Sequence, residues 1–163
     1  KVKGADALIV DANILPESCE FLSRWCKQKK IFFAGVAVST EKMKNFAGLV
    51  SDFDCLVMNK LEARALIKNY HKDHDDKYFD TNVLNLQCGA ITEGAKGVTI
   101  IEGSKATSFQ APRSLAVVDS HGAGDAFAAG FISGRVQALP LDQAVSMAFK
   151  WAQKTLQHWG SQP

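Results

Sequence analysis

The sequence predicts an α/β fold built on a mainly parallel β-sheet. In the first 70 residues, short apolar runs typical of buried strands alternate with longer segments of helical periodicity, and the connections are short. Two parallel strands need a crossover such as a helix between them, so this alternation favours parallel crossover units. The length of 163 residues, with 47% hydrophobic and 22% charged residues, fits one globular domain or a large piece of one.

Three strand–helix repeats are predicted before residue 71. In chain order they are a strand at 7–10, a helix at 16–29, a strand at 31–36, a helix at 40–50, a strand at 55–58 and a helix at 60–70. Each strand is a continuous apolar run, as expected for a strand covered on both faces. Pro16 marks the start of the first helix, because proline suits the first helical position.

The second part of the chain has a different rhythm. Residues 71–80 are polar and charged, and we expect a surface loop there. Three short strand signals follow, divided by glycine turns, which predicts a strand and then a hairpin or meander. A further apolar run leads into a glycine turn, and two helices separated by Pro140 end the chain. These elements are expected at 89–92, 97–101, 105–109 and 115–118 for the strands, and at 124–138 and 141–158 for the helices.

Charge and composition exclude several classes of protein. The net charge of +2 is too small to predict binding to nucleic acid or to an anionic membrane. No apolar run approaches the roughly 20 residues that a membrane span needs, and no signal peptide is visible. The four cysteines, Cys19, Cys26, Cys55 and Cys88, lack CxxC spacing, which argues against zinc. Cys55 and Cys88 lie in strand-like runs and are expected to be buried, small apolar residues in a reducing cytoplasm.

The beginning of the sequence predicts a fragment. Residue 1 is Lys rather than Met, and residues 2–11 already lead into a buried strand. We therefore expect that the upstream part of the domain is absent from this chain.

The segment from Asp119 to Asp125, with the sequence DSHGAGD, is the most informative in the chain. Gly122 and Gly124 allow a tight turn and the close approach of a ligand. The helix that follows offers unpaired N–H groups and the positive end of its dipole, which suit an anion. A carboxylate beside an anion site can deprotonate a hydroxyl next to a phosphate. The alternative is an ordinary strand-to-helix turn in which Asp125 is the N-cap.

A second polar pair follows the strand at 55–58. Asn59 and Glu62 are three residues apart at the start of a helix, at the carboxyl end of a strand, where ligands bind to parallel sheets. A carboxylate there can hold Mg²⁺ through water near phosphates. The alternative is a capping box, in which Asn59 is the N-cap and Glu62 is the third helical residue.

A third polar loop follows the strand at 89–92. Thr92, Gly94 and Gly97 place one hydroxyl and two glycines where a nucleotide can pass close to the backbone. A plain hairpin turn is the alternative. The three polar segments all follow strands, and this agreement favours one shared site for a nucleotide and a metal.

These residues resemble the pfkB, or ribokinase-like, family of carbohydrate and nucleoside kinases, across essentially all 163 residues. Asp119 to Asp125 is similar to the family pattern D-[ST]-x-G-A-G-D, Asn59 to Glu62 to N-x-x-E, and Thr92 to Gly94 to T-x-G. The resemblance implies a ribokinase-like three-layer α/β/α fold, of which residues 1–163 are the C-terminal portion of a single kinase domain. The N-terminal sugar-binding region and the lid are missing.

The resemblance also implies roles for individual residues. Asp125 would be the general base, and the amides of Gly122, Ala123 and Gly124 would form the anion hole for the transferred phosphoryl group. Asn59 and Glu62 would organise Mg²⁺ and the phosphates. Thr92 and Gly94, with the nearby Gly97, would line the ATP site. Asp119, together with the loop near Gly160, would hold a potassium ion.

The implied reaction is ATP- and Mg²⁺-dependent phosphoryl transfer to a hydroxyl of a sugar or nucleoside in the cytoplasm. Residues 7–14 and 38–42 resemble stretches of pseudouridine kinases, with ribokinases and fructokinases as the alternative. Two rival functions are that of a dehydratase or vitamin-precursor kinase on the same fold, and that of a non-catalytic ATP-binding regulatory module. Family members often dimerise through the lid, which is consistent with a homodimer of the full-length protein.

Several further residues are weaker candidates. Phe149 stands where family members often carry an Asn near the adenine, which implies a rearranged base pocket. His121 lies inside the DSHGAGD segment and is able to approach a phosphate, although the family pattern leaves its position open. His71 and His74 favour a solvated loop over a metal site. The tryptophans at positions 25, 151 and 159 are expected to serve packing.

Overall fold

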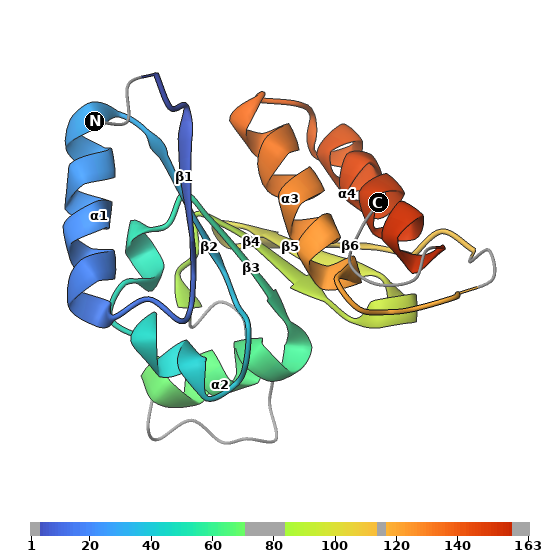
Figure 1. Cartoon of the computed structure of the whole chain (residues 1–163), viewed down its shortest axis with the longest axis horizontal. Coiled ribbons are helices and arrows are strands. Elements are labelled where there is room, and N and C mark those ends of the chain that lie inside the picture. Colours follow the sequence, from blue (N-terminus) through green and yellow to red (C-terminus); the bar gives the residue numbers. More distant parts are fainter. Residues whose placement is uncertain (1–3, 71–83, 114–116, 158–163) are drawn as a thin grey trace. The chain divides into compact units, whose positions relative to one another are not determined.

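A computed structural model describes residues 4–70, 84–113 and 117–157 (Figure 1). The polar loop expected at 71–80, with His71 and His74, lies outside these residues, as do Trp159 and Gly160. The chain divides into two compact units. The first comprises Lys1–Thr92 and Thr99–Thr107, and the second comprises Glu93–Val98 and Ser108–Pro163.

The strands form one six-stranded sheet in the order β1-β2-β3-β4-β5-β6. Its first four strands pair in parallel, as predicted. Only five residues join β4 to β5 and two join β5 to β6, connections too short for a parallel crossover, so these pairs are antiparallel. The strands are β1 Ala7–Asp11, β2 Phe32–Val36, β3 Cys55–Asn59, β4 Cys88–Thr92, β5 Val98–Glu102 and β6 Lys105–Phe109.

Helices connect two of the parallel pairs in the first unit. Helix α1 (Pro16–Lys29) joins β1 to β2, and α2 (Lys60–Tyr70) joins β3 to β4. Pro16 is at the start of α1, and Lys30 ends the helix in the left-handed conformation at φ 55°. The sheet register aligns Val10 with Gly35. The alternation predicted from the sequence is therefore confirmed for these elements.

The helix predicted at 40–50 is wrong. The segment instead contains two short 3₁₀ helices, Lys42–Asn45 and Val50–Asp52. The Asn45 side chain donates a hydrogen bond of 2.9 Å to the carbonyl of Ala12, and Gly48 interrupts the predicted helix. Phe46 is fully buried. These tertiary contacts hold the chain in tight turns, which outweigh the weak helical pattern.

A cluster of phenylalanines lies in the core of the first unit. Phe33 stacks on Phe53 with ring centroids 4.9 Å apart, and Phe46 meets Phe53 edge-on at 4.8 Å. Gly35 allows this packing, because a Cβ there would lie 2.9 Å from Phe53 Cε1.

The cysteines of the first unit belong to its interior. Burial raises the pKa of the Cys19 thiol to about 11, with a further contribution from nearby Asp52. All four cysteines are buried and none forms a disulfide, so the burial predicted for Cys55 and Cys88 is confirmed.

Two helices dominate the second unit. Helix α3 (Ala123–Val136) and helix α4 (Leu141–Leu156) pack closely through small residues. A Cβ at Gly130 would lie 2.8 Å from Ala148 Cα, and one at Gly134 would lie 2.8 Å from Ala144 Cβ. This close approach packs the second half of α3 tightly against α4.

Two predictions for the second unit are wrong. Val117 and Val118 do not form a strand; the amide of Val118 donates a hydrogen bond of 2.8 Å to the Leu156 carbonyl at the end of α4. Trp151 does not have the packing role predicted for it, because it is 42% exposed. Trp25, by contrast, packs against the core of the first unit as predicted. Among the described residues, no helix is both long and apolar enough to cross a membrane.

Candidate active site

The carboxyl ends of β3 and β4 bring two predicted site residues together. The parallel register pairs Asn59 with Thr92, the last residues of the two strands. Adjacent strands lie about 4.8 Å apart, so these side chains begin at neighbouring positions on one edge of the sheet. The sequence prediction that both residues lie at this edge is confirmed.

Asn59 and Glu62 form a reciprocal capping box at the start of α2. The Asn59 Oδ1 atom accepts hydrogen bonds from the amides of Leu61 at 2.9 Å and Glu62 at 3.0 Å. In return, Glu62 Oε2 accepts a hydrogen bond of 2.7 Å from the Asn59 amide. These bonds satisfy backbone donors that the first turn of a helix leaves without partners.

The capping box does not use both oxygens of Glu62. The side chain is 6% exposed, and its Oε2 atom is engaged by the Asn59 amide. Its Oε1 atom has no hydrogen-bond partner within the described residues. One carboxylate oxygen suits Mg²⁺, which is usually held by one or two carboxylates, waters and substrate phosphates. The pair therefore fits both the metal site and the capping box that the sequence suggested.

The loop after Thr92 contains two glycines with different roles. Gly94 has φ 60°, is exposed, and a Cβ there would meet no atom within 4 Å, so its backbone is open to a ligand. Gly97 has φ 110° and is buried, and a Cβ there would lie 2.0 Å from the Phe109 carbonyl oxygen. Gly97 is thus needed for packing against the chain that leaves β6.

The turn before α3 depends on Gly122. This residue is the N-cap of α3 and has φ 77°, a left-handed conformation that favours glycine. Asp125 is the third residue of the helix, so the interpretation of Asp125 as the N-cap is wrong. The Asp125 side chain is exposed and makes no hydrogen bond or ion pair with another described residue. Its carboxylate is therefore available to a ligand.

Backbone amides in this turn are also available. The amides of Gly122, Gly124 and Asp125 have no hydrogen-bond partner in the described part of the chain. The Ala123 amide donates to the Ser120 carbonyl at 3.3 Å, a long distance for such a bond. Unpaired amides at the positive end of a helix dipole form an anion site.

A side-chain pair closes the other end of the turn. Asp119 Oδ1 lies 2.7 Å from His121 Nδ1 and accepts a hydrogen bond of 3.0 Å from the His121 amide. The Asp119 side chain is 16% exposed, whereas that of His121 is 87% exposed. The sequence predicts that Asp119 and the loop near Gly160 hold a potassium ion. The structure shows Asp119 bonded to His121 of the same turn, and the loop near Gly160 lies outside the described residues.

Asp125 also lines a pocket between α3 and α4. The pocket has a volume of about 520 Å³, within the usual range for small-molecule sites. Trp151, Lys154 and Thr155 of α4 line it on one side, and Ala126 and Ala129 of α3 on the other. Trp151 is exposed because it lines this pocket. The sequence pattern did not indicate the pocket, because its shape depends on how the two helices pack.

The predicted site residues fall into two groups. Asn59, Glu62 and Thr92 belong to the first unit, at the carboxyl edge of the sheet. The residues of the second unit are Gly94, Gly97, Asp119, Gly122, Ala123, Gly124 and Asp125. Strands β3 and β4 and helices α2 and α3 form as the sequence predicts, whereas the strand predicted at 115–118, before Asp119, is not seen at Val117 and Val118.

A model of the pfkB family of carbohydrate kinases matches residues 2–163, so the chain belongs to that family. Two similar proteins are kinases of small molecules. A cytidine kinase of Thermococcus kodakarensis is 38% identical over 71 residues, which are 43% of this chain and 26% of that protein. A fructoselysine 6-kinase of Escherichia coli is 37% identical over 71 residues, 44% of this chain and 27% of that protein.

Solved structures confirm the ribokinase-like fold class. A carbohydrate kinase from Agrobacterium tumefaciens aligns with a TM-score of 0.77 at 28% identity, over 96% of this chain and 49% of that one. An adenosine kinase from Schistosoma mansoni aligns with a TM-score of 0.82 at 20% identity, over 99% of this chain and 53% of that one. The chain therefore spans about half the length of these structures.

Gly124 allows a test of the anion site that spares the fold. A Cβ there would meet no atom within 4 Å, and alanine favours helix more than glycine by about 1 kcal/mol. We expect Gly124→Ala to keep or slightly raise the melting temperature, while its methyl group weakens tripolyphosphate binding at least about tenfold. Calorimetry measures both quantities.

Gly48→Ala is the matched control, because a Cβ at Gly48 also meets no atom within 4 Å. This variant should bind tripolyphosphate like the original chain. Equal binding by Gly124→Ala and Gly48→Ala would contradict an anion site at the start of α3.

Proposed function

We propose that the protein catalyses ATP- and Mg²⁺-dependent phosphoryl transfer to a hydroxyl group of a sugar or nucleoside. The observation that carries this proposal is the start of α3, where three unpaired amides and the exposed, unpartnered Asp125 carboxylate lie within four consecutive residues. Membership of the pfkB family supports it. The cytidine, adenosine and fructoselysine kinases among its relatives support an acceptor of this class.

The reaction assigns a role to each group at this turn. Asp125 accepts the proton of the acceptor hydroxyl as its oxygen forms a bond to the γ-phosphorus of ATP. The bond between that phosphorus and the bridging oxygen breaks, and ADP leaves with the electron pair. The amides of Gly122 and Gly124 donate to the transferred phosphoryl group, and the Ala123 amide joins them by giving up its long bond to the Ser120 carbonyl. Fixed donors of this kind balance the charge of the transferred group.

The carboxyl edge of the sheet would hold the metal and the donor phosphates. Glu62, with its free Oε1 atom, is the proposed Mg²⁺ ligand, and Asn59 orients it through the capping box. Bound Mg²⁺ would neutralise the charge of the β- and γ-phosphates. Thr92 and Gly94 would line the nucleotide site with their hydroxyl and open backbone, and Gly97 holds that loop in place.

Asp119 is the proposed ligand for K⁺. Its Oδ1 atom accepts a hydrogen bond from the His121 amide and lies beside the His121 ring, and these contacts hold the carboxylate at the turn where the ion would bind. The loop near Gly160 would supply the remaining oxygen ligands.

Within this class of acceptor, pseudouridine remains a prediction from residues 7–14 and 38–42, with ribose and fructose as alternatives. None of the relatives named above is a pseudouridine kinase. A cytoplasmic location is proposed with this function, since the four buried, free thiols suit a reducing compartment. A non-catalytic ATP-binding module is less favoured, because Asp125 is exposed and free to act as a base.

Asp125→Asn tests the general base. In the protein at its full native length, we expect kcat to fall by about 10²–10⁴-fold, because the amide cannot take the proton. The dissociation constant for ATP should change little. ADP release is measured with pseudouridine, ribose, fructose, cytidine and adenosine as acceptors, and Glu17→Gln, a change in the first turn of α1, is the control.

Two results would overturn parts of this proposal. Turnover that survives Asp125→Asn nearly unchanged would reject Asp125 as the base. Tight ATP binding without turnover on any acceptor would instead favour the non-catalytic module.

Glu62→Gln separates metal binding from capping. The carboxamide oxygen of the introduced glutamine is able to accept the hydrogen bond from the Asn59 amide, since glutamine also forms capping boxes. We expect an unchanged melting temperature and a Mg²⁺ requirement raised by about tenfold or more, because the charge that attracts the ion is gone. Activity is titrated against Mg²⁺ at fixed ATP. An identical Mg²⁺ titration for both proteins would show that Glu62 serves only to cap α2.

A further inference from the structure

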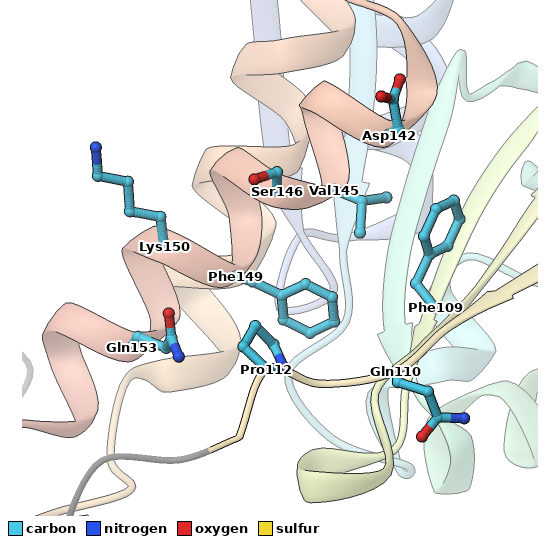
Figure 2. A pocket seen from close by; sticks show the side chains of 9 residues that line it. All are labelled: Phe109, Gln110, Pro112, Asp142, Val145, Ser146, Phe149, Lys150 and Gln153. Atoms are coloured by element: carbon cyan, nitrogen blue, oxygen red, sulfur yellow. The ribbon is translucent and has the colours of Figure 1, made fainter.

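A second pocket in the same unit lies between α4 and the chain that follows β6 (Figure 2). Its volume is about 310 Å³, near the lower end of the range for small-molecule sites. Phe149 and Val145 of α4 and Pro112 of the facing chain provide apolar surface, and Figure 2 shows the Phe149 side chain beside Pro112. The remaining lining is mostly polar, so the pocket offers one apolar side, which suits the face of a flat ring system, beside hydrogen-bonding groups.

The Phe149 ring is held by a neighbour in α3. It meets the buried Phe127 ring edge-on, with centroids 5.4 Å apart and an interplanar angle of 71°. Phe149 is half-buried, so part of its surface remains to line the pocket. A ring fixed in this way offers stacking without a large loss of side-chain freedom.

The same contact connects the pocket to the anion site. Phe127 follows Ala123 by four residues on α3, or about 6 Å along the helix axis. The aromatic pocket and the unpaired amides therefore lie near each other within one unit, as the base and the phosphates of a nucleotide require.

The uncharged hydrogen-bonding groups around this pocket do not distinguish strongly between adenine and guanine. Gln110, Ser146 and Gln153 line it, and carboxamides and hydroxyls both donate and accept. They are able to pair with the amino edge of adenine or the oxo edge of guanine.

Charged residues discriminate more strongly between bases, but those at this pocket are poorly placed to do so. Asp142 is seven residues from Phe149, about 10 Å along α4. The Lys150 ammonium points away from the Phe149 ring (Figure 2). The face of the base, rather than its edge, is therefore the feature that this pocket recognises.

We infer that Phe149 determines the selection of the phosphoryl donor: it holds a purine base by stacking, so the protein accepts GTP as well as ATP. This inference rests on the proposed function. Sites that exclude an analogue strongly do so with fixed hydrogen-bond partners, whereas apolar pockets discriminate only modestly. A base held mainly by its face is therefore recognised as a purine and not as adenine alone.

Calorimetry with Mg²⁺–ATP, Mg²⁺–GTP and tripolyphosphate tests the inference. We expect dissociation constants for ATP and GTP within about tenfold of each other. Phe149→Ala should weaken both nucleotides by roughly 5- to 150-fold, the effect of losing one base–aromatic stack, and leave tripolyphosphate binding unchanged. Phe149→Leu keeps apolar packing against Phe127 and should weaken both nucleotides in the same direction, which guards against misfolding of the alanine variant. Gln143→Ala, at an exposed position of α4, is the control.

Each outcome has a defined meaning. GTP binding more than about 100-fold weaker than ATP binding, or nucleotide binding unaffected by both Phe149 variants, would overturn the inference. Either result leaves the proposed function intact if Asp125→Asn still abolishes turnover with ATP. Failure of all three ligands to bind would overturn the proposed function and this inference together.

Discussion

The left-handed conformation of Gly122 is the constraint on which the candidate active site depends. A residue with a side chain is strained at φ 77°, so glycine is what allows the chain to enter α3 this abruptly. The abrupt entry leaves amides of the first turn without partners and exposes Asp125. The close packing of Gly130 against Ala148 then anchors the helix that carries this turn. The left-handed backbone at Gly122 is thus what makes the amides and the Asp125 carboxylate available for the proposed phosphoryl transfer.

The first turn of α2, which carries Glu62, satisfies its backbone amides in a different way from α3. There the helix is capped by side chains, and the bonds between Asn59 and Glu62 stabilise the helix while they orient a carboxylate. Capping uses only the Oε2 atom of Glu62, which leaves Oε1 for the Mg²⁺ ion that we propose it binds. At the start of α2, the Asn59 side chain bonds the amides of the first turn. At the start of α3, amides of the first turn have no partner among the described residues, which suits an anion.

Local patterns predicted most of the fold, and the failures have physical causes. Continuous apolar runs marked the buried strands, and the glycine turn before Asp125 marked the start of α3. The helix predicted at 40–50 does not form because tertiary contacts, among them the hydrogen bond from the Asn45 side chain to the Ala12 carbonyl, hold the segment in tight turns. The strand predicted at 115–118 is not seen at Val118, because the Val118 amide bonds to the Leu156 carbonyl at the end of α4, which is distant in sequence. The pocket beside Phe149 was missed, since only the packing of separate segments creates it.

The anion site at the start of α3 is tested most directly by observing the amides of this turn while an anion binds. In an amide NMR titration of the chain with tripolyphosphate, we expect the resonances of Gly122, Gly124 and Asp125 to shift most strongly and to saturate together. Hydrogen bonds from these unpaired donors to phosphate oxygens are the expected cause. Saturable binding that shifts other resonances and leaves these three unchanged would contradict an anion site at the start of α3.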